Sequence, residues 1–524
     1  MKKPALRVFI RVDASLKIGV GHVMRCLTLA NTLKKNGADV SFICRDYPGH
    51  LQVFIQKQGF DVELLRQHQD GYAIHDGGSE YSGWLGVSWQ QDAEETKKFL
   101  RLQSVDWLII DHYGIDFRWH KCMRSHTKKI MVIDDLANRN LHCDLLLDQT
   151  YGREKNRYSA LVHGKSELLL GTGYALIRPE FKKLRQKAIA KRNNRECVSR
   201  VLVSMGSMDP DNLTSLVLAG LGNVNWKENP IVDVVLGSKA PGLQSVINQA
   251  KKHSLIVNVL ENVDNMPNLM LSADLAIGAG GTTSWERCSL GLPTLLVKLA
   301  DNQTEVISVL VKAGTARRVF DIKNDLVKEC NNFVHNPTLM SELSENAFKV
   351  ADGQGAELTA IKILPDISRD GGQITIRNAN MNDAEIIHKW QLNPLTRRHF
   401  LDPATPEYDK HLIWLDKVLA IPTDFFYIIE YDNEPAGVLR LSHKCNEINN
   451  YHLVSIYVSP DHYRLGLGAT ALGYCDRLFS GNELRAEILK KNIASKNLFL
   501  KCGYVKNSEH DLYIKNPQNR TVYL

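Results

Sequence analysis

The stretch Gly278–Glu286, Gly-Ala-Gly-Gly-Thr-Thr-Ser-Trp-Glu, constrains the fold more than any other part of the chain. It follows Ala273–Ile277, which is typical of a buried parallel strand, and it leads into a helical segment that Gly291 and Pro293 end. A strand, a glycine turn and a helix start form an anion site, because the turn admits a phosphate to the backbone and the helix N-terminus favours its charge. The alternative is a tight turn without a ligand.

Glu286 favours the ligand-binding interpretation. It lies one helical turn inside the helix, where its carboxylate can accept hydrogen bonds from both hydroxyls of a ribose. The stretch therefore predicts a nucleotide site.

The length of the chain predicts several domains. Its 524 residues exceed one ordinary domain and suggest about three. With 44% hydrophobic and 23% charged residues, the composition is that of a globular protein with full cores.

Charge and cysteine usage exclude several function classes. The formal charge of +7 is spread along the chain, and the basic run 182–192 is expected to be a solvated helix face, so we expect no nucleic-acid partner. The ten cysteines form no Cys-x-x-Cys pair, which argues against a zinc site and for a reducing cytoplasm. No apolar run is long enough to span a membrane and no signal-peptide core is visible, so we expect neither a membrane partner nor a metal.

A second glycine turn lies near the N-terminus. Leu6–Val12 is a short apolar run, and after Asp13 and the turn Gly19–Gly21 a helical pattern begins with His22. There the helix dipole favours the neutral imidazole, which can accept a proton. A cap or packing role for His22 is the alternative.

Short apolar strands alternate with helix-like segments through the first half of the chain. This alternation predicts a doubly wound parallel sheet, whose ligands bind at the carboxyl ends of the strands. Polar groups follow three of these strands: Asp13, Asp111-His112-Tyr113 and Asp134-Asp135. Each Asp alone is more simply a helix cap, but their repetition at one rim suggests a site.

A second series of the same kind begins at Val201–Ser204 and continues through the strands 231–237, 255–260, 274–281 and 293–299. Two Rossmann-like halves, one contributing His22 and the other the glycine turn, suit nucleotide-sugar chemistry. Asn302 and Gln303 follow the last strand and are expected to point toward the same cleft.

Several motifs in this region together resemble one family. They are Asp13 with Gly19-x-Gly21-His22-x-x-Arg25, Asp111-His112-Tyr113, Ile133-Asp134-Asp135-Leu136, Gly171 through Tyr174–Phe181, and Gly278–Glu286 followed by Gly291-Leu292-Pro293 and Asn302-Gln303. The family is the UDP-sugar hydrolase of bacterial pseudaminic acid biosynthesis, a relative of the glycosyltransferase that makes lipid II. The resemblance covers about two thirds of the chain. One departure is Met205–Asp209, where relatives usually have a double glycine before Ser and Asp.

The resemblance implies a two-domain GT-B fold and the release of UDP from UDP-2,4-diacetamido-2,4,6-trideoxy-β-L-altropyranose by water. It implies that His22 is the catalytic residue, which we expect to act as the base. From its place after the first strand, Asp13 is expected either to orient or polarise His22 or to cap a helix. The residues expected to bind the substrate are Gly21, Arg25, Tyr113, Gly280, Gly281, Thr282, Glu286, Asn302 and Gln303.

The last third of the chain differs in kind. A polar, glycine-bearing joint over 365–372 precedes a strand at Ile374–Arg377, a helix over 383–391, a hairpin with its turn at Asp432-Asn433 and a strand over 453–458. A further glycine turn, Gly466-x-Gly468, then opens a helix over 470–479 and is suited to a pyrophosphate.

This order, with Asn492-x-x-Ser495 before Gly503-Tyr504, resembles the GNAT acetyltransferases. By context the nearest kin is the enzyme that acetylates the 4-amino UDP-sugar just before the hydrolase acts. The resemblance implies acetyl-CoA as co-substrate and contacts to it from Val458, Arg464, Gly466, Gly468 and Asn492. A loop-capping role for Asn492 is the alternative.

Two departures from the GNAT pattern leave its chemistry open. Tyr463 stands where the family has Arg or Gln before the first glycine, with Arg464 one residue later. Phe499 stands where many relatives have a tyrosine acid, so Ser455, Tyr457 or water remain as candidates for the general acid.

We therefore expect an α/β chain with a GT-B-like pair of Rossmann-type domains, 1–170 and 171–364, a linker over 365–372 and a GNAT domain over 373–524. The expected partners are a UDP-amino-sugar and acetyl-CoA. Two other interpretations stay open: a UDP-sugar glycosyltransferase or related hydrolase fused to an acetyltransferase of another amine, and a sugar-nucleotide binding module with degenerate catalysis.

Overall fold

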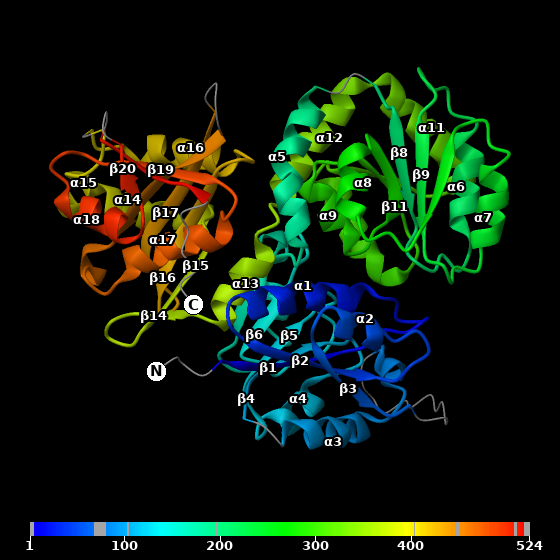
Figure 1. Ribbon diagram of the computed structural model, residues 1–524, viewed down its shortest axis with the longest axis horizontal. Coiled ribbons are helices and arrows are strands. Elements are labelled where there is room, and N and C mark those ends of the chain that lie inside the picture. Colours follow the sequence, from blue (N-terminus) through cyan, green and yellow to red (C-terminus); the bar gives the residue numbers. More distant parts are fainter. Residues whose placement is uncertain are drawn as a thin grey trace. The chain divides into compact units, whose positions relative to one another are not determined.

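The computed structural model describes residues 5–67, 80–101, 104–194, 197–402, 404–445, 450–507 and 511–517. Its contacts divide the chain into two compact units, residues 1–356 and 357–524. The predicted α/β class is confirmed, with two parallel sheets in the first unit and one mixed sheet in the second (Figure 1).

The first parallel sheet has the strand order β3-β2-β1-β4-β5-β6-β7. Its interior strands are nearly continuous apolar runs, as expected where helices cover both faces. The strands are β1 (Arg7–Val12), β2 (Asp39–Arg45), β3 (Asp61–Leu65), β4 (Val105–Asp111), β5 (Thr127–Ile133), β6 (Leu145–Asp148) and β7 (Glu167–Leu170). The helices are α1 (Gly21–Lys35), α2 (Gln52–Lys57), α3 (Trp89–Leu100) and α4 (Phe117–Met123), with short 3₁₀ turns η1 (Ser82–Leu85), η2 (Lys155–Tyr158) and η3 (Thr172–Tyr174).

The second parallel sheet has the order β10-β9-β8-β11-β12-β13. Its strands are β8 (Arg200–Ser204), β9 (Ile231–Leu236), β10 (Val257–Glu261), β11 (Leu275–Ala279), β12 (Thr294–Val297) and β13 (Ala316–Val319). The helices are α5 (Pro179–Asn193), α6 (Leu213–Leu221), α7 (Leu243–Ala250), α8 (Met266–Ser272), α9 (Thr283–Ser289), α10 (Thr304–Lys312), α11 (Ile322–His335) and α12 (Pro337–Val350), and η4 spans Asp301–Gln303.

Alternate residues of β8 face opposite layers of the second sheet. Val201 and Val203 pack in a core with α6, α7 and α11, whereas Leu202 packs with α5, α8, α9 and α12. The period of two along the strand thus divides the apolar residues between two helical layers. The two glycine turns predicted in the first unit lie where a strand of a parallel sheet ends and a helix begins.

The sheet of the C-terminal unit has the order β14-β15-β16-β17-β18-β19-β21-β20. Its strands are β14 (Asp366–Ile367), β15 (Gln373–Asn378), β16 (Phe425–Tyr431), β17 (Glu434–Cys445), β18 (Asn450–Val458), β19 (Glu483–Glu487), β20 (Val505–Lys506) and β21 (Leu512–Lys515). The helices are α13 (Gly355–Ile363), α14 (Ala384–Leu392), α15 (Pro394–Arg397), α16 (Tyr408–Leu419), α17 (Leu467–Leu478) and α18 (Ile493–Lys501), with the turns η5 (Met381–Asp383) and η6 (Pro460–His462).

The hairpin between β16 and β17 turns at Asp432 and Asn433, as predicted. Both residues have positive φ, 48° and 68°, a backbone conformation that Asp and Asn tolerate in two-residue hairpin turns. Residues 365–372, expected as a linker, contain β14, which pairs with β15 in the same sheet.

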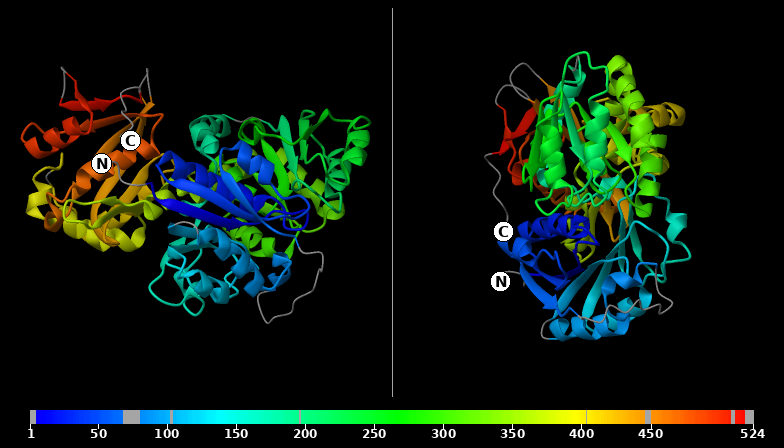
Figure 2. Two further views of the ribbon diagram at one scale, coloured as in Figure 1. Left: turned by 60° about the horizontal axis from the view of Figure 1, so that its bottom comes forward. Right: turned by 90° about the vertical axis from the view of Figure 1, so that its right-hand side faces the viewer.

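The long antiparallel strands β17 and β18 run side by side (Figure 2), and β18 then meets β19 in parallel. The β18–β19 register covers only Tyr451–Leu453. Beyond Leu453 the two strands are unpaired with each other, so the sheet splays open over the second half of β18.

Candidate active sites

His22 lies in the first turn of α1, directly after Gly21. Its Nδ1 atom lies 2.7 Å from Oδ1 of Asp111 at the end of β4. Arg25, one turn further along α1, donates from Nε to Oδ2 of Asp111 at 2.6 Å and from Nη2 to Oδ1 at 2.6 Å. The helix start and the strand end are therefore joined by a bidentate ion pair that also contacts the histidine.

The charge on Asp111 defines which nitrogen of His22 carries the proton. Burial opposes ionisation of Asp111, but the Arg25 guanidinium and His22 hold its pKa well below the usual range. An ionised carboxylate only accepts, so Nδ1–H of His22 donates to it and Nε2 keeps a free lone pair. With 11% of the His22 side chain exposed, this lone pair is suited to accept a proton from a bound water.

Aromatic rings surround His22. The ring of Tyr113 lies edge-on to it at 4.7 Å between centroids, and the ring of Trp84 at 6.0 Å. Trp84 comes from η1, and Tyr81 packs edge-on against it at 5.0 Å. The sequence interpretation missed Trp84, although two aromatic residues within the four-residue stretch 81–84 are a usable signal.

Arg25 and Tyr113, expected as substrate-binding residues, both contact His22 and Asp135, and their binding of the substrate stays a prediction. Arg25 is 3% exposed, and its third donor, Nη1, bonds Oδ2 of Asp135 at 2.9 Å. The hydroxyl of Tyr113 donates to the other oxygen of Asp135. Because their polar groups are occupied within the protein, both residues are suited to positioning His22 and Asp111.

The expectation that Asp13 orients His22 is corrected by the strand register. Val12 pairs with Asp111, so the Asp111 side chain shares the face of Val12, and Asp13 points to the opposite face. There it accepts from Nη1 of Arg11 at 2.5 Å and from the backbone N–H of Arg45 at 2.6 Å. Burial opposes its ionisation, but Arg11 and His112 hold the pKa of Asp13 well below the usual range.

The glycine turn of the second half joins β11 to α9. Arg287 fixes it by donating from Nη2 to the carbonyl of Ala279 at 2.6 Å and to Oγ of Ser284 at 3.0 Å. A Cβ atom added to Gly280 would lie 2.4 Å from Cγ1 of Ile307, whereas one added to Gly281 would meet no atom within 4 Å. Gly281 is therefore the position of the turn at which another molecule can approach the backbone.

The two glycine turns of the first unit face each other. A Cβ atom added to Gly21 would lie 3.6 Å from Oγ1 of Thr282. The structure thus brings together the turn that carries His22 and the turn predicted to bind a nucleotide.

Glu286 lies in the middle of α9 and pairs with Arg178, whose Nε donates to Oε1 at 3.0 Å. Burial raises the pKa of Glu286, and Arg178 opposes this shift. Gln303 lies beside the turn, with its Oε1 accepting from the N–H of Leu299 at 3.0 Å, and Asn302 is exposed. Arg178 is a contact of Glu286 that the sequence interpretation did not assign.

Arg153, also missed from the sequence, connects the two halves. Its Nη1 donates to Oε1 of Glu305 on α10 at 2.6 Å, and its Nη2 donates to the carbonyl of Asp135 at 2.9 Å. It also pairs with Asp148 at the end of β6. A basic residue in a loop has no sequence pattern that reveals such a pairing.

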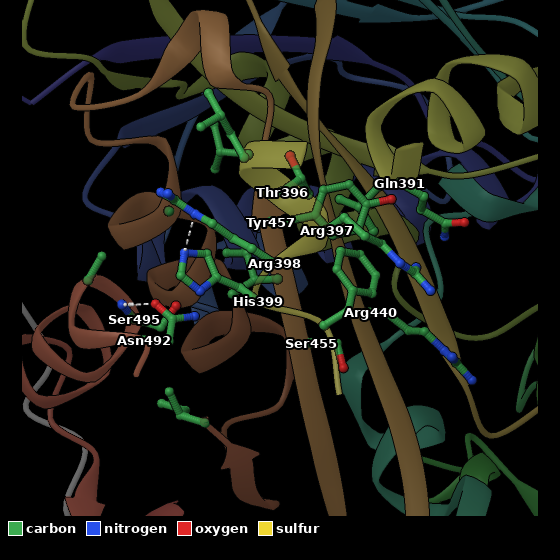
Figure 3. Close-up of a pocket in the computed structure, with 18 of the residues that line it drawn as sticks. Gln391, Thr396, Arg397, Arg398, His399, Arg440, Ser455, Tyr457, Asn492 and Ser495 are labelled. Carbon is green, nitrogen blue, oxygen red and sulfur yellow. Dashed lines mark hydrogen bonds between the residues drawn. The ribbon is translucent and has the colours of Figure 1, made fainter. Parts of the chain in front are cut away.

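The C-terminal unit contains a cavity of about 1300 Å³ where β18 and β19 splay apart (Figure 3). The five residues predicted to contact coenzyme A all line it: Val458, Arg464, Gly466, Gly468 and Asn492. Gly466 has φ of 100° and directly precedes α17, and Arg464 has φ of 66°. The Oδ1 atom of Asn492 accepts from the N–H of Ser495 at 3.0 Å, so the capping role of this side chain is present.

The candidates for the general acid also lie in this cavity. Ser455 and Tyr457 line it from β18, and burial raises the pKa of the Tyr457 hydroxyl. Phe499 is buried on α18 with its ring edge-on to that of Tyr504 at 4.8 Å. The assignment of the acid to Ser455 or Tyr457 stays a prediction.

The described residues contain no group of three or more His, Cys, Asp or Glu placed to hold a metal ion. None of the helices in these residues is long and apolar enough to cross a membrane.

Two parts of the chain match different family models. Residues 388–504 match the model of the Acetyltransferase (GNAT) family, and residues 200–356 match that of the Glycosyltransferase family 28 C-terminal domain. The chain is 28% identical over 310 residues to the UDP-2,4-diacetamido-2,4,6-trideoxy-beta-L-altropyranose hydrolase of Campylobacter jejuni. The aligned region covers 59% of this chain and 97% of the hydrolase. The spore coat polysaccharide biosynthesis protein SpsG of Bacillus subtilis is 24% identical over 373 residues, 69% of this chain and 98% of SpsG.

Among solved structures, MurG of Acinetobacter baumannii has a TM-score of 0.50 at 15% identity and covers 68% of this chain and 99% of that one. This likeness shows the paired Rossmann-type fold of the first unit. The chain is therefore an enzyme that joins a sugar-nucleotide-processing part to a GNAT acetyltransferase domain, and it is a homologue of the Campylobacter hydrolase and of SpsG.

Proposed function

We propose that the chain is a bifunctional enzyme of pseudaminic acid biosynthesis. The C-terminal unit transfers acetyl from acetyl-CoA to the 4-amine of a UDP-4-amino-4,6-dideoxy-N-acetyl-altrosamine. The N-terminal unit hydrolyses the product, UDP-2,4-diacetamido-2,4,6-trideoxy-β-L-altropyranose, to free sugar and UDP. The observation that carries this proposal is His22, oriented by Asp111, in a chain homologous to the Campylobacter hydrolase.

In the hydrolysis, water attacks the anomeric carbon and its proton passes to Nε2 of His22. The bond from this carbon to the diphosphate oxygen breaks, and its electron pair leaves with UDP. Asp111, as the acceptor of Nδ1–H, stabilises the imidazolium that forms. Because UDP is a good leaving group, the main tasks of the protein are to hold the water and to stabilise the departing charge.

The UDP site of this proposal is the turn Gly280–Thr282 with Glu286, Asn302 and Gln303. The open space at Gly281 admits a phosphate to the backbone N–H groups, and Glu286 accepts the ribose hydroxyls. Arg178, which pairs with Glu286, opposes the rise that burial causes in the pKa of this carboxylate.

In the acetyl transfer, the amine nitrogen attacks the thioester carbonyl, the carbon–sulfur bond breaks and the sulfur takes up a proton as CoA leaves. The splayed strands β18 and β19 and the turn Gly466–Gly468 hold acetyl-CoA in this proposal. Two observations support this acetyl-CoA site. Residues 388–504 match the GNAT family model, and all five residues predicted to contact coenzyme A line one cavity.

An NMR time course tests both steps. The purified chain is incubated with the UDP-4-amino sugar, with and without acetyl-CoA. We expect CoA and the acetylated UDP-sugar first, then free diacetamido sugar and UDP. Release of UDP without acetyl-CoA, or no acetylation, would contradict the proposed sequence of steps.

A glycosyltransferase is the second candidate, because residues 200–356 match a glycosyltransferase domain model. The two candidates differ in the acceptor. Free sugar as the product with no added acceptor indicates hydrolysis, whereas UDP release that requires an added acceptor indicates glycosyl transfer.

A further inference from the structure

One end of the cavity in the C-terminal unit is lined by side chains with unused hydrogen-bonding capacity. We call it the acceptor pocket and define it by Gln391, Thr396, His411, Trp414, Arg440 and Tyr457. These residues come from α14, α15, α16, β17 and β18. Figure 3 shows Gln391 and Arg440 on the side of the cavity away from Asn492 and Ser495.

Four buried polar atoms of the acceptor pocket have no hydrogen-bond partner among the residues that the structure describes: Oγ1 of Thr396, Nδ1 of His411, Nε of Arg440 and the hydroxyl oxygen of Tyr457. Thr396 is 4% exposed and His411 is 1% exposed. Nε2 of His411 lies 3.0 Å from the carbonyl of Ala384, so this nitrogen is the donor and Nδ1 is a bare acceptor. Buried polar groups are nearly always satisfied in native proteins, so such a set inside a cavity indicates a polar ligand.

Arg440 has the most unused capacity. Its guanidinium lies 5.6 Å from the ring centroid of Trp414, and Nη2 donates to Oδ2 of Asp424 at 3.4 Å. Asp424 also accepts from the backbone N–H of His443 at 2.9 Å. A guanidinium has five donors in a planar fork that matches phosphate and carboxylate, so one long bond leaves most of them available.

The phosphates of acetyl-CoA do not account for Arg440. The residues that the proposed function assigns to the coenzyme, Arg464, Gly466 and Gly468, come from the turn before α17. Arg440 lies in the middle of β17, opposite Ser455 in the register with β18. The acetyl acceptor is the other molecule that must enter this cavity.

The charge of the cavity selects between kinds of acceptor. Apart from Arg464, which is assigned to the coenzyme, its lining contains six Lys and Arg side chains against three acidic ones: Arg369, Arg397, Arg398, Lys410, Arg440 and Lys501 against Asp402, Glu407 and Glu487. Such a surface attracts an anionic acceptor and disfavours a polyamine through like-charge repulsion.

We propose that Arg440 is a specificity-determining residue that holds a phosphate group of the acetyl acceptor, so that the C-terminal unit acetylates phosphate-bearing amines. This rests on the proposed acetyl transfer and names the residue that recognises its acceptor. Trp414 keeps the guanidinium in place by stacking.

The test compares acetyl transfer to the UDP-4-amino sugar by Arg440→Met and by the wild type. The release of CoA measures the rate of this transfer. Methionine keeps an unbranched stem of about the length of the aliphatic part of arginine and removes the guanidinium with its charge and donors. We expect the KM of the acceptor to rise roughly 10- to 100-fold and the KM of acetyl-CoA to stay unchanged. Arg440→Lys, which keeps the charge but not the fork, should fall between the two. An unchanged KM for the acceptor, or a rise in the KM of acetyl-CoA alone, would overturn the proposal.

Arg485→Met is the matched control. Arg485 also stacks on an aromatic ring, that of Tyr451, and pairs with Glu483, but it does not line the cavity. We expect unchanged kinetics for this variant. Equal losses in the Arg485 and Arg440 variants would mean that the loss of stacking, and not of phosphate binding, is the cause.

A second set of acceptors separates this inference from the proposed function. We compare glucosamine 6-phosphate with glucosamine and with spermidine. If the UDP-4-amino sugar is not acetylated but the phosphorylated amine is preferred, and Arg440→Met abolishes that preference, the inference stands and the proposed function fails. Equal use of glucosamine and its phosphate, a preference for spermidine, or no turnover of any of these amines would refute the inference.

Discussion

Nδ1 of His22 and Oδ1 of Asp111 lie 2.7 Å apart, joining the first turn of α1 to the end of β4. The two residues are 89 positions apart in the chain. Arg25 neutralises the carboxylate from one turn further along the same helix, so the charge required to orient the histidine is tolerated in a buried place.

Replacing Asp111 should impair hydrolysis without impairing acetylation. In Asp111→Asn the amide can donate to Nδ1, which moves the imidazole proton to Nε2 and removes the lone pair that accepts from water. We expect UDP release to slow roughly 10²- to 10⁴-fold, the range of general base catalysis. Asp106→Asn, at the other end of β4, is the control. A rate within about twofold of wild type would show that Asp111 does not orient the base.

Gly280 and Gly281 should respond differently to the same change. In Gly280→Ala the new methyl group would meet Ile307 at 2.4 Å, so we expect a loss of about 1–3 kcal/mol in the free energy of unfolding. Gly281→Ala meets no atom and should keep its stability, but it should raise the KM of the UDP-sugar if a phosphate approaches there. Denaturant unfolding and initial rates measure the two effects. An unchanged KM in Gly281→Ala would place the phosphate elsewhere.

Asp13→Asn should affect stability and not chemistry. The change leaves the buried Arg11 without one of its charged partners, and breaking such a pair costs about 3–5 kcal/mol. Because the folded pKa of Asp13 is depressed, its contribution is present above the ordinary pKa and is lost as the pH falls below it. Urea unfolding should show the loss, while the kcat of the folded fraction for UDP release stays near that of wild type. A large fall in kcat with normal stability would return Asp13 to the catalytic machinery.

Asp148 should make the stability of the first unit depend on pH. Burial and the nearby Asp135 raise the pKa of Asp148 from 3.8 to about 6, against the opposing effect of Arg153. A raised folded pKa means that the native state binds the proton more tightly, so stability is lost as the pH rises through 6. Relative to Asp148→Asn, the wild type should lose about 1 kcal/mol of unfolding free energy between pH 5 and pH 7. A difference between the two proteins that does not change with pH would contradict the shift.

The glycine turns and the hairpin were predictable from sequence because they depend on local backbone conformation. Gly466 and the Asp432-Asn433 pair have the positive φ angles that their residue types favour. The edge strands β3, β7 and β13 were missed. Charged residues interrupt the apolar pattern of β3 and β13, and β7 is only four residues long.

The identity of the carboxylate beside His22 was not predictable, because it depends on which strands are neighbours. Asp13 is closer in sequence, but β1 and β4 pair with Val12 opposite Asp111, and this register directs Asp13 to the other face of the sheet. The acceptor pocket was missed for a similar reason. Arg440 and Trp414 belong to a strand and a helix that have no motif, and only the tertiary fold places them together.

The most direct test of the central claim measures both activities of His22→Ala in one assay. UDP release and CoA release are followed together, with the acetylated UDP-sugar and the amino UDP-sugar as the respective substrates. If His22 is the base, UDP release should fall by at least about 10²-fold while CoA release is unchanged. UDP release at the wild-type rate would show that His22 is a structural residue and that the proposed hydrolysis mechanism is wrong.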